Sequence, residues 1–312
     1  MTEGPLERIV RESGVDDIVE VLSERLSPTD LQSLLLEVAR RRAARISPSD
    51  LLERYQRDRF VRPAAVDAAA LSAFELLAWS LLPDGFEAIE PSPLCPLGTS
   101  SIVGTVNQNK VVSTVRTAEV VADTTNVLAL ECALRRRTLL ADRTRRLERV
   151  CLAASQRQVR AQGLAAGQRA HFRLVGLCVA GRDRGQFAFE TESLVELIGY
   201  LVTVVGRAQP DWRVEVGITD LGDRSGLLER EVLHPLSERF PGARLRMDPD
   251  RASGRGYYVD ACFKLWAGRD GEPALELGDG GCTTWTRQLL SNEKERLVIA
   301  GLGVERLLGV RI

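Results

Sequence analysis

The chain has 312 residues, enough for one large domain or for one domain with a smaller companion. Hydrophobic residues make up 44% of it, which allows a real core, and the formal net charge of -1 excludes a general electrostatic attraction to nucleic acid. Six scattered cysteines without a CxxC pair, and only two histidines, argue against a zinc site and for buried thiols in a cytoplasmic protein.

The N-terminal part of the sequence predicts short helices. No apolar run is long enough to cross a bilayer, and the opening MTEGPLERIV lacks the apolar centre of a signal peptide, so a cytoplasmic protein without a membrane partner is expected. Residues 1–62 predict a small helical region with two amphipathic helices. Ser27 or Thr29 is expected to cap the first, and Ser47, Pro48 and Ser49 before Asp50 repeat the capping pattern at the second. Its arginine clusters can touch RNA or a partner, although a solvated helix face explains them more simply.

Residues 63–312 predict the larger domain. Helices are expected over residues 69–82, 125–137, 192–205, 226–240 and from 304 onward. Strands are expected over residues 86–94, 109–121, 149–162, 170–180, 212–220, 243–247, 256–267, 273–281 and 296–301. Because the later strands follow one another without a helix between each pair, the pattern favours an α+β fold, a mostly antiparallel sheet flanked by helices. A dinucleotide-binding fold is disfavoured, because GLGVER lacks a third glycine and no βαβ unit follows it.

One strand pair predicts a ligand site by its side chains. Arg160 and Phe172 lie on successive strands across a Gly-containing turn, so a guanidinium and a ring can meet over one ligand. Arg306, past the glycine step of GLGVERLL, can add a second cation, and two arginines with a ring suit a nucleotide triphosphate. From spacing alone, a surface arginine and a core phenylalanine are the simpler interpretation.

From about Leu71 to the C-terminus, the sequence resembles the catalytic domain of class II aminoacyl-tRNA synthetases, closest to the histidyl and seryl types. Three motifs appear in order: GFEAIEPSPL, similar to the family's dimer-interface segment; VRAQGLAAGQRAHF, similar to its second motif; and GLGVERLL, which matches its third. The resemblance implies a class II synthetase-like core, a homodimer, and ATP with Mg²⁺ as cofactors.

The resemblance also implies roles in nucleotide binding. Arg160 falls on the arginine that holds the α-phosphate, Phe172 on the ring that stacks on adenine, and Arg306 on the arginine that reaches the γ-phosphate. Gln162 replaces a family glutamate, which affects substrate handling. Glu276, in ALELGDGGCTTW, falls on the glutamate that binds magnesium.

Further stretches imply contacts with an amino-acid-like substrate. In STVRTAEVV, Thr117 and Glu119 fall on the Thr-x-Glu pair that contacts an α-amine, whereas a loop carboxylate in water is the alternative for Glu119. GRGYYVDACF resembles a histidyl-type strand and brings Tyr257 toward the substrate. The arginine of that strand falls on Ser253, so the displaced Arg255 would have to substitute for it.

Two functions of different classes follow. The first is a free-standing ligase that adenylates an amino acid or similar carboxylate with ATP and passes it to an unknown acceptor, such as a carrier protein, a small molecule or a tRNA. The second is a non-catalytic paralogue that serves as a regulatory or partner-binding subunit. No anticodon-binding domain is expected after the third motif, which disfavours a standard tRNA synthetase. Arg160 and Arg306 favour the ligase, while Gln162 and Ser253 favour the regulator.

Overall fold

The computed structural model describes residues 3–161, 170–251 and 256–309. The chain divides into two compact units, residues 1–62 with 113–118 and residues 63–112 with 119–312. The first unit holds α1 (Pro5–Ser13), α2 (Ile18–Glu20), the π-helix η1 (Val21–Arg25), α3 (Pro28–Ala43) and α4 (Pro48–Arg57). The hydroxyls of Ser27 and Ser47 accept hydrogen bonds from backbone N–H groups in the first turns of α3 and α4, so Ser27, one of the two candidates, caps α3 and Ser47 caps α4.

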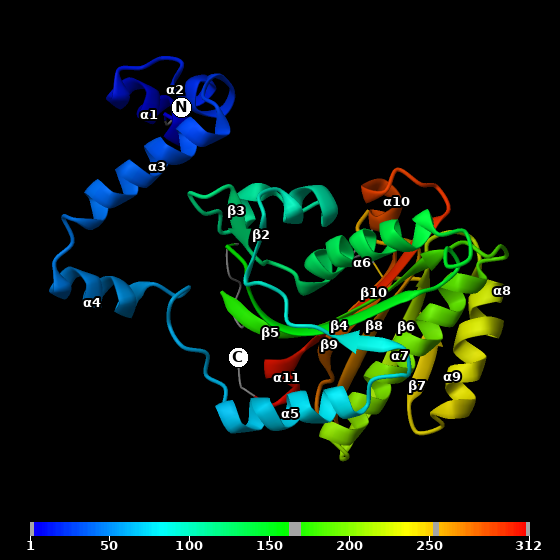
Figure 1. The fold of residues 1–312 in the computed structure, drawn as a ribbon. Coiled ribbons are helices and arrows are strands. Elements are labelled where there is room, and N and C mark those ends of the chain that lie inside the picture. The colour runs from blue at the N-terminus through cyan, green and yellow to red at the C-terminus, as the bar shows by residue number, and fades with distance from the viewer. Residues whose placement is uncertain (1–2, 162–169, 252–255, 310–312) are drawn as a thin grey trace. The chain divides into compact units, whose positions relative to one another are not determined.

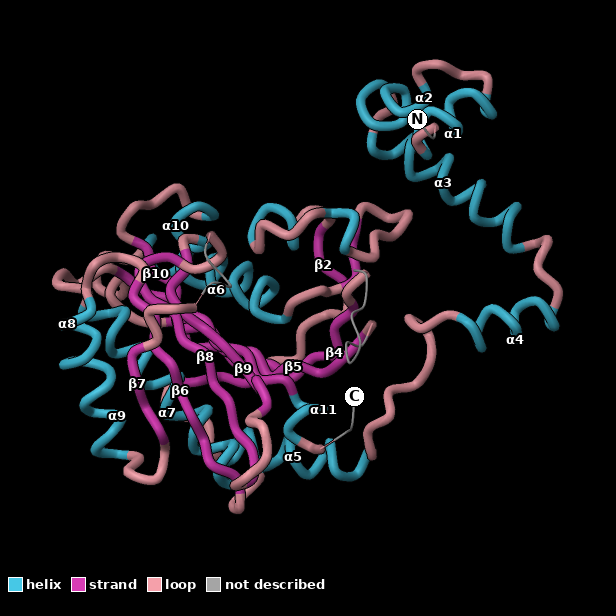
Figure 2. Tube along the Cα trace, turned by 180° about the vertical axis from the view of Figure 1, so that it is seen from behind, coloured by secondary structure: helices cyan, strands magenta, loops and turns pink. Residues whose placement is uncertain are grey.

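The second unit is built on an eight-stranded sheet with the order β1-β4-β5-β10-β9-β8-β6-β7 (Figures 1 and 2). Its strands are β1 (Phe86–Ala88), β4 (Val150–Val159), β5 (His171–Arg182), β6 (Trp212–Asp220), β7 (Arg244–Met247), β8 (Val259–Arg269), β9 (Leu275–Thr283) and β10 (Glu295–Gly303). The β1–β4 and β6–β7 pairs are parallel, and the five pairs between them are antiparallel. The predicted α+β fold with a mostly antiparallel sheet is therefore confirmed.

Helices cover both faces of this sheet (Figure 1). They are α5 (Ala68–Ser80), α6 (Thr124–Ala141), α7 (Ala188–Ala208), α8 (Ser225–Leu228), the π-helix η4 (Glu229–Leu233), α9 (His234–Arg239), α10 (Trp285–Leu289) and α11 (Val304–Leu307). The short pair β2 (Leu94–Pro96) and β3 (Ala118–Val120) lies apart from the main sheet, with η2 (Thr99–Val103) and η3 (Gln108–Lys110) between its strands. The strand expected over 109–121 is thus largely wrong, because the chain there forms a 3₁₀ turn and a loop.

Alternation along the strands creates two hydrophobic cores. Val175, Leu177 and Val179 of β5 join the core beneath α5, α7 and α9, whereas Cys178 and Ala180 join the core beneath α6 and α10. Successive side chains of a strand point to opposite faces, so one continuous apolar run supplies both layers. All six cysteines are buried thiols. In the described part of the chain, no helix has the length and apolar character needed to span a membrane.

A fully buried ion pair joins α6 to the start of β10. Arg136 Nε lies 2.8 Å from Glu295 Oε2, and Arg136 also donates to the backbone oxygens of Arg146 and Glu148. A buried charge left without its partner costs about 3–5 kcal/mol, so this pair holds the two elements in one geometry.

Candidate functional site

A pocket of about 440 Å³ opens where α6 begins, and we call it the α6 pocket. Strands β5, β8, β9 and β10 and the loops before α6 and β8 contribute to it. It is lined by Val106, Lys110, Ala122, Asp123, Thr125, Asn126, Arg160, Leu174, Arg251, Tyr257, Tyr258, Lys264, Glu276, Asp279, Ile299 and Gly301. Four cationic and three acidic side chains face one cavity, which suits a ligand that carries charge of both signs.

Arg160 follows β4 and lies at the wall of the α6 pocket. Its Nε donates to the backbone oxygen of Ala122 at 3.1 Å, and its Nη2 lies 3.3 Å from Asp123 Oδ2. The guanidinium stands 5.1 Å from the centre of the Phe172 ring, so the two strands bring arginine and ring together as their pairing predicts. With 37% of its side chain exposed, Arg160 can still reach an anion in the pocket.

Asp123 is the acidic group beside Arg160. Its Oδ1 accepts hydrogen bonds from the backbone N–H and the hydroxyl of Thr125, which caps α6. Its Oδ2 faces Arg160 and accepts from the hydroxyl of Tyr257 at 3.5 Å. Burial, followed by the negative charge of Asp123, raises the pKa of Tyr257 well above its ordinary value, so the phenol keeps its proton and remains a donor.

Thr117 and Glu119, predicted to contact a substrate amine, lie outside the lining of this pocket. Thr117 is in an exposed loop with φ of 53°. Glu119 is fully buried, and its carboxylate accepts from the backbone of Gly98 at 2.9 Å, the backbone of Ser100 at 2.7 Å and the Gln108 amide at 2.8 Å. Near Glu119 in the sequence, Asp123 and Thr125 do line the pocket.

Burial alone would raise the pKa of Glu119, but hydrogen bonds from Gln108, Ser100 and Gly98 outweigh it and hold the pKa below its ordinary value. The carboxylate is therefore ionised and already served by the loop that surrounds it. Contact between Glu119 and a substrate amine stays a prediction, and it requires that some of these hydrogen bonds break.

Arg251 is a pocket residue that the sequence did not predict. Its guanidinium donates to the backbone oxygen of Phe263 at 2.7 Å, pairs with Asp279 at 3.1 Å and lies 5.4 Å from the centre of the Tyr258 ring. The side chain is almost completely buried, whereas a lone arginine in a loop ordinarily reads as a surface residue. Gln162, Ser253 and Arg255 lie outside the described residues.

Glu276 lies in the α6 pocket, as its predicted role in magnesium binding requires. Its Oε2 pairs with Lys264 Nζ at 2.8 Å, and Asp279 is the second carboxylate of the same strand in the pocket. Within residues 3–161, 170–251 and 256–309, no cluster of three or more His, Cys, Asp or Glu side chains is suited to a metal ion. One or two carboxylates with phosphate oxygens can suffice for Mg²⁺, so these two residues fit an ion that arrives with a nucleotide.

Arg306 lies in α11, directly after the glycine step that ends β10. It is exposed, and its Nη1 donates to the backbone oxygen of Glu276 at 2.8 Å, outside the lining of the pocket. Its neighbour Glu305 is buried, accepts from the Arg173 backbone at 2.9 Å and pairs with Arg157 at 3.0 Å. The structure thus unites Arg160, Tyr257 and Glu276 in one pocket, with Phe172 on Arg160, and leaves Arg306 at its edge.

Asn126 lies in the first turn of α6 and also lines the pocket. Its side chain is buried, yet neither its oxygen nor its nitrogen has a hydrogen-bond partner among the described residues. A Cβ atom on Gly104 would lie 2.7 Å from Asn126 Oδ1, so a glycine at 104 makes room for this amide. Buried polar groups are normally satisfied, and an unpaired amide at a pocket indicates a ligand contact.

No family profile and no curated protein sequence matches the chain. Solved structures do. A histidyl-tRNA synthetase from S. aureus superimposes with a TM-score of 0.55 and 13% identity, over 77% of this chain and 63% of the synthetase. A Bacillus halodurans protein described as an ATP phosphoribosyltransferase regulatory subunit/histidyl-tRNA synthetase gives a TM-score of 0.61 and 14% identity, over 81% and 82%.

A third structure, described as the RNA-binding domain of a threonyl-tRNA synthetase from Cryptosporidium parvum, gives a TM-score of 0.57 and 11% identity. It is matched over 78% of this chain and 62% of its own. The chain therefore spans less than two thirds of either synthetase structure. At such identities the likeness concerns the fold, and over about four fifths of its length this chain has the fold of the class II aminoacyl-tRNA synthetase catalytic domain.

Proposed function

We propose that the α6 pocket binds an amino acid or similar carboxylate together with ATP and joins them as an acyl adenylate. The observation that carries this proposal is the opposed pair Arg160 and Asp123 in one cavity. Asp123 Oδ2 offers a carboxylate oxygen to the α-ammonium group of the substrate. The guanidinium of Arg160, 3.3 Å away, offers donors to a phosphate on the other side.

The reaction needs positive charge around phosphorus. A substrate carboxylate oxygen forms a bond to the α-phosphorus of ATP, the bond to the bridging oxygen breaks, and pyrophosphate leaves. Negative charge grows on the α-phosphate and on the leaving group, so Arg160, Arg251 and Lys264 in the pocket stabilise the transition state. A magnesium ion held by Glu276 and Asp279 would neutralise phosphate charge.

Phe172 and Arg306 complete the proposed nucleotide site. In this proposal the ring of Phe172, which lies beneath Arg160, would stack on adenine. Arg306 would exchange its hydrogen bond with the Glu276 backbone for one with the γ-phosphate. In this proposal Thr125 and Asp123 take the positions expected of Thr117 and Glu119, because they line the pocket.

A second candidate is a subunit that binds the amino acid without activating it and regulates a partner. Two observations favour it: Arg306 stands outside the pocket lining, and the fold is also that of a Bacillus halodurans protein whose description begins with a regulatory subunit. In that case ATP would not bind, while Asp123 would still hold an amine.

Amino-acid-dependent exchange of labelled pyrophosphate into ATP separates the two candidates. Each standard amino acid is tested with wild type, Arg160→Ala and, as a matched surface control, Arg145→Ala. Arg160→Ala should lower exchange about a hundred- to a thousandfold, the usual effect of losing one preorganised donor, and Arg145→Ala should leave it unchanged. If no amino acid supports exchange but one binds the wild type and not Asp123→Asn, the regulatory function is correct.

We further propose a homodimer through α5 and β1, the segment that resembles the family's interface motif. β1 is an edge strand of the sheet, and Leu76 on α5 is 72% exposed. Light scattering should report a dimer, and Leu76→Glu should shift it toward monomer. A wild-type monomer at micromolar concentration would contradict this proposal.

A further inference from the structure

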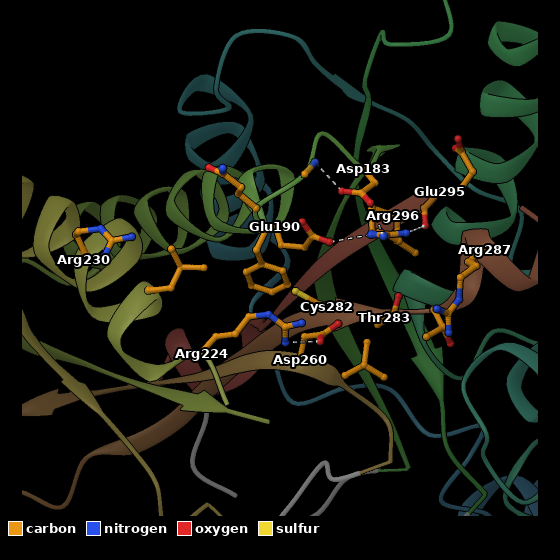
Figure 3. A pocket seen from close by; sticks show the side chains of 17 residues that line it. Asp183, Glu190, Arg224, Arg230, Asp260, Cys282, Thr283, Arg287, Glu295 and Arg296 are labelled. Carbon is orange, nitrogen blue, oxygen red and sulfur yellow. Dashed lines mark hydrogen bonds and ion pairs between the residues drawn. The ribbon is translucent and has the colours of Figure 1, made fainter. Parts of the chain in front are cut away.

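A second pocket, which we call the α7 pocket, is lined by other residues of strands that also contribute to the α6 pocket, and Figure 3 shows its side chains. It measures about 620 Å³ and opens between the start of α7, the loop before α8, and α10. On β9, Glu276 and Asp279 line the α6 pocket, whereas Cys282 and Thr283 line the α7 pocket. The two cavities share strands but no lining residue, so the α7 pocket is a separate site.

Glu190 is a buried acid in this pocket, and only one of its two carboxylate oxygens has a partner among the described residues. Its side chain is 5% exposed, and Oε1 lies 2.9 Å from Arg296 Nε. Arg296 also pairs with Asp183, whose Oδ2 lies 2.9 Å from Arg296 Nη2. In Figure 3, Glu190 and Asp183 both lie beside Arg296. Glu190 Oε2 is buried and has no hydrogen-bond partner among the residues that the structure describes. A buried carboxylate oxygen without a donor is costly, and a ligand donor would remove that cost.

The pKa of Glu190 also indicates that its carboxylate can accept a ligand donor. Burial raises the pKa of its carboxyl, and a hydrogen bond with its own backbone and the positive charge of Arg296 oppose this shift without cancelling it. The ion pair with Arg296 therefore offsets only part of the free-energy cost of burying the carboxylate charge. A cationic donor that binds at Oε2 would offset the remaining cost.

Thr283 is a second residue of the pocket whose polar group lacks a hydrogen-bond partner among the described residues. Its hydroxyl is buried and has no partner in the described ranges, although its backbone sits in the ladder opposite Leu297 of β10. Hydroxyl groups both donate and accept, so Thr283 can bind either end of a polar ligand.

Arg287 supplies the positive charge on the α10 side of the pocket. Its ion pair with Glu293 measures 3.3 Å, and Glu293 is 86% exposed, so the pair is weak. Arg224, by contrast, is held by Asp260 at 2.8 Å and lies 4.9 Å from the centre of the Phe187 ring, which makes it part of the wall. The guanidinium of Arg287 can therefore turn to a ligand anion at little cost.

We propose that the α7 pocket is a second ligand site for a small zwitterion, a free α-amino acid, with its ammonium on Glu190 and its carboxylate on Arg287 and Thr283. The volume lies within the range of small-molecule sites. At the ammonium end, Glu190 Oε2 has no partner among the described residues, and at the carboxylate end, Arg287 has only a weak ion pair with Glu293. This site does not depend on whether the α6 pocket catalyses a reaction.

The experiment measures binding of labelled L-amino acids, one at a time, to the full chain by equilibrium dialysis. Glu190→Gln keeps the shape and the hydrogen bond to Arg296 but removes the charge, and should weaken binding at this site about tenfold or more. Arg287→Ala removes a half-buried side chain whose ion pair is weak, so folding should not be disturbed; it should weaken binding about tenfold, because one charge-assisted contact is lost. Thr283→Val should weaken it about threefold to tenfold.

Asp123→Asn is the matched control at the α6 pocket, and it should leave binding at the α7 pocket unchanged. Analogues of the bound amino acid that lack the amine or the carboxylate should bind at least about tenfold more weakly. The proposal is overturned if no amino acid binds, or if every binding event is lost in Asp123→Asn and unaffected by Glu190→Gln and Arg287→Ala. Crystals soaked with the bound amino acid should show it between Glu190 and Arg287, and density confined to the α6 pocket would also overturn the proposal.

Discussion

Glu119 and Asp123 are two acids on one short stretch of chain, and they stand in contrasting surroundings. Glu119 is the central residue of β3 and is fully buried, and three donors from the segment between β2 and β3 use both of its carboxylate oxygens. Asp123 is 20% exposed, uses one oxygen to cap α6 and turns the other toward Arg160 and a cavity. A carboxylate whose two oxygens accept hydrogen bonds from the neighbouring loop stabilises that loop. A carboxylate with one oxygen facing a pocket is available to a ligand.

The largest effect on stability is expected when the carboxylate of Glu119 is removed. Glu119→Ala leaves the buried backbone donor of Ser100 and the partly buried donors of Gly98 and Gln108 without their acceptor. The free energy of unfolding should fall by about 4 kcal/mol, since each unpaired buried donor costs roughly 1–3 kcal/mol. Urea unfolding measures it. A loss below 1 kcal/mol would show that the loop does not depend on this carboxylate.

The pH dependence of stability tests the same residue with less disruption. The folded pKa of Glu119 is lowered from its ordinary 4.5, so its ionised form stabilises the fold. That contribution is fully present above pH 4.5 and is lost as pH falls through the lower folded pKa. The difference in stability between wild type and Glu119→Gln should therefore shrink as pH falls below 4.5. A constant difference across pH 3 to 7 would contradict the assignment.

Asp123→Asn tests the other acid of the comparison, whose carboxylate faces the α6 pocket. Asparagine caps a helix as well as aspartate, so stability should change by less than about 0.5 kcal/mol. Binding of an amino acid in the α6 pocket should weaken about a hundredfold, or about 3 kcal/mol, because a charge partner of the ammonium is lost. Calorimetric titration of the two proteins measures both constants. Equal affinities would mean that the amine lies elsewhere.

Sequence reasoning predicted the fold well because it depends on patterns that repeat. The apolar runs over 170–180 and 296–301 became β5 and β10, and the capping pattern at Ser47 became the start of α4. It failed over 109–121, where alternation resembles a strand but the chain is fixed instead by the hydrogen bonds that surround Glu119.

Within the candidate site, the strand pair that carries Arg160 and Phe172 was predictable because cross-strand neighbours follow from register. Asp123 was not predicted as a lining residue, because the sequence does not tell whether the carboxylate of Glu119 or that of Asp123 faces the pocket. Arg251 could not be predicted either, since its burial depends on long-range contacts with Phe263 and Asp279.

A smaller effect is expected at Asn126, which resembles Asp123 in its position at the pocket. Asn126→Leu replaces an unpaired buried amide with an apolar group of similar size, so the protein should become more stable by about 2 kcal/mol. Ligand affinity in the α6 pocket should fall in the same variant, because function and stability are opposed at an unsatisfied polar group. Urea unfolding and titration are read together. Destabilisation with unchanged affinity would show that the amide has a structural partner.

The smallest effect is expected at Arg306, which stands apart from the pocket that holds Arg160. Its guanidinium must leave the Glu276 backbone before it can reach a phosphate, so part of any binding energy is spent on that exchange. Arg306→Ala should weaken ATP binding about fivefold, near 1 kcal/mol, and leave amino-acid binding unchanged. Titration with ATP and Mg²⁺ measures it, with Arg160→Ala as the larger reference. Should Arg306→Ala match the loss in Arg160→Ala, the two arginines act on the nucleotide together and α11 must turn toward the pocket when ATP binds.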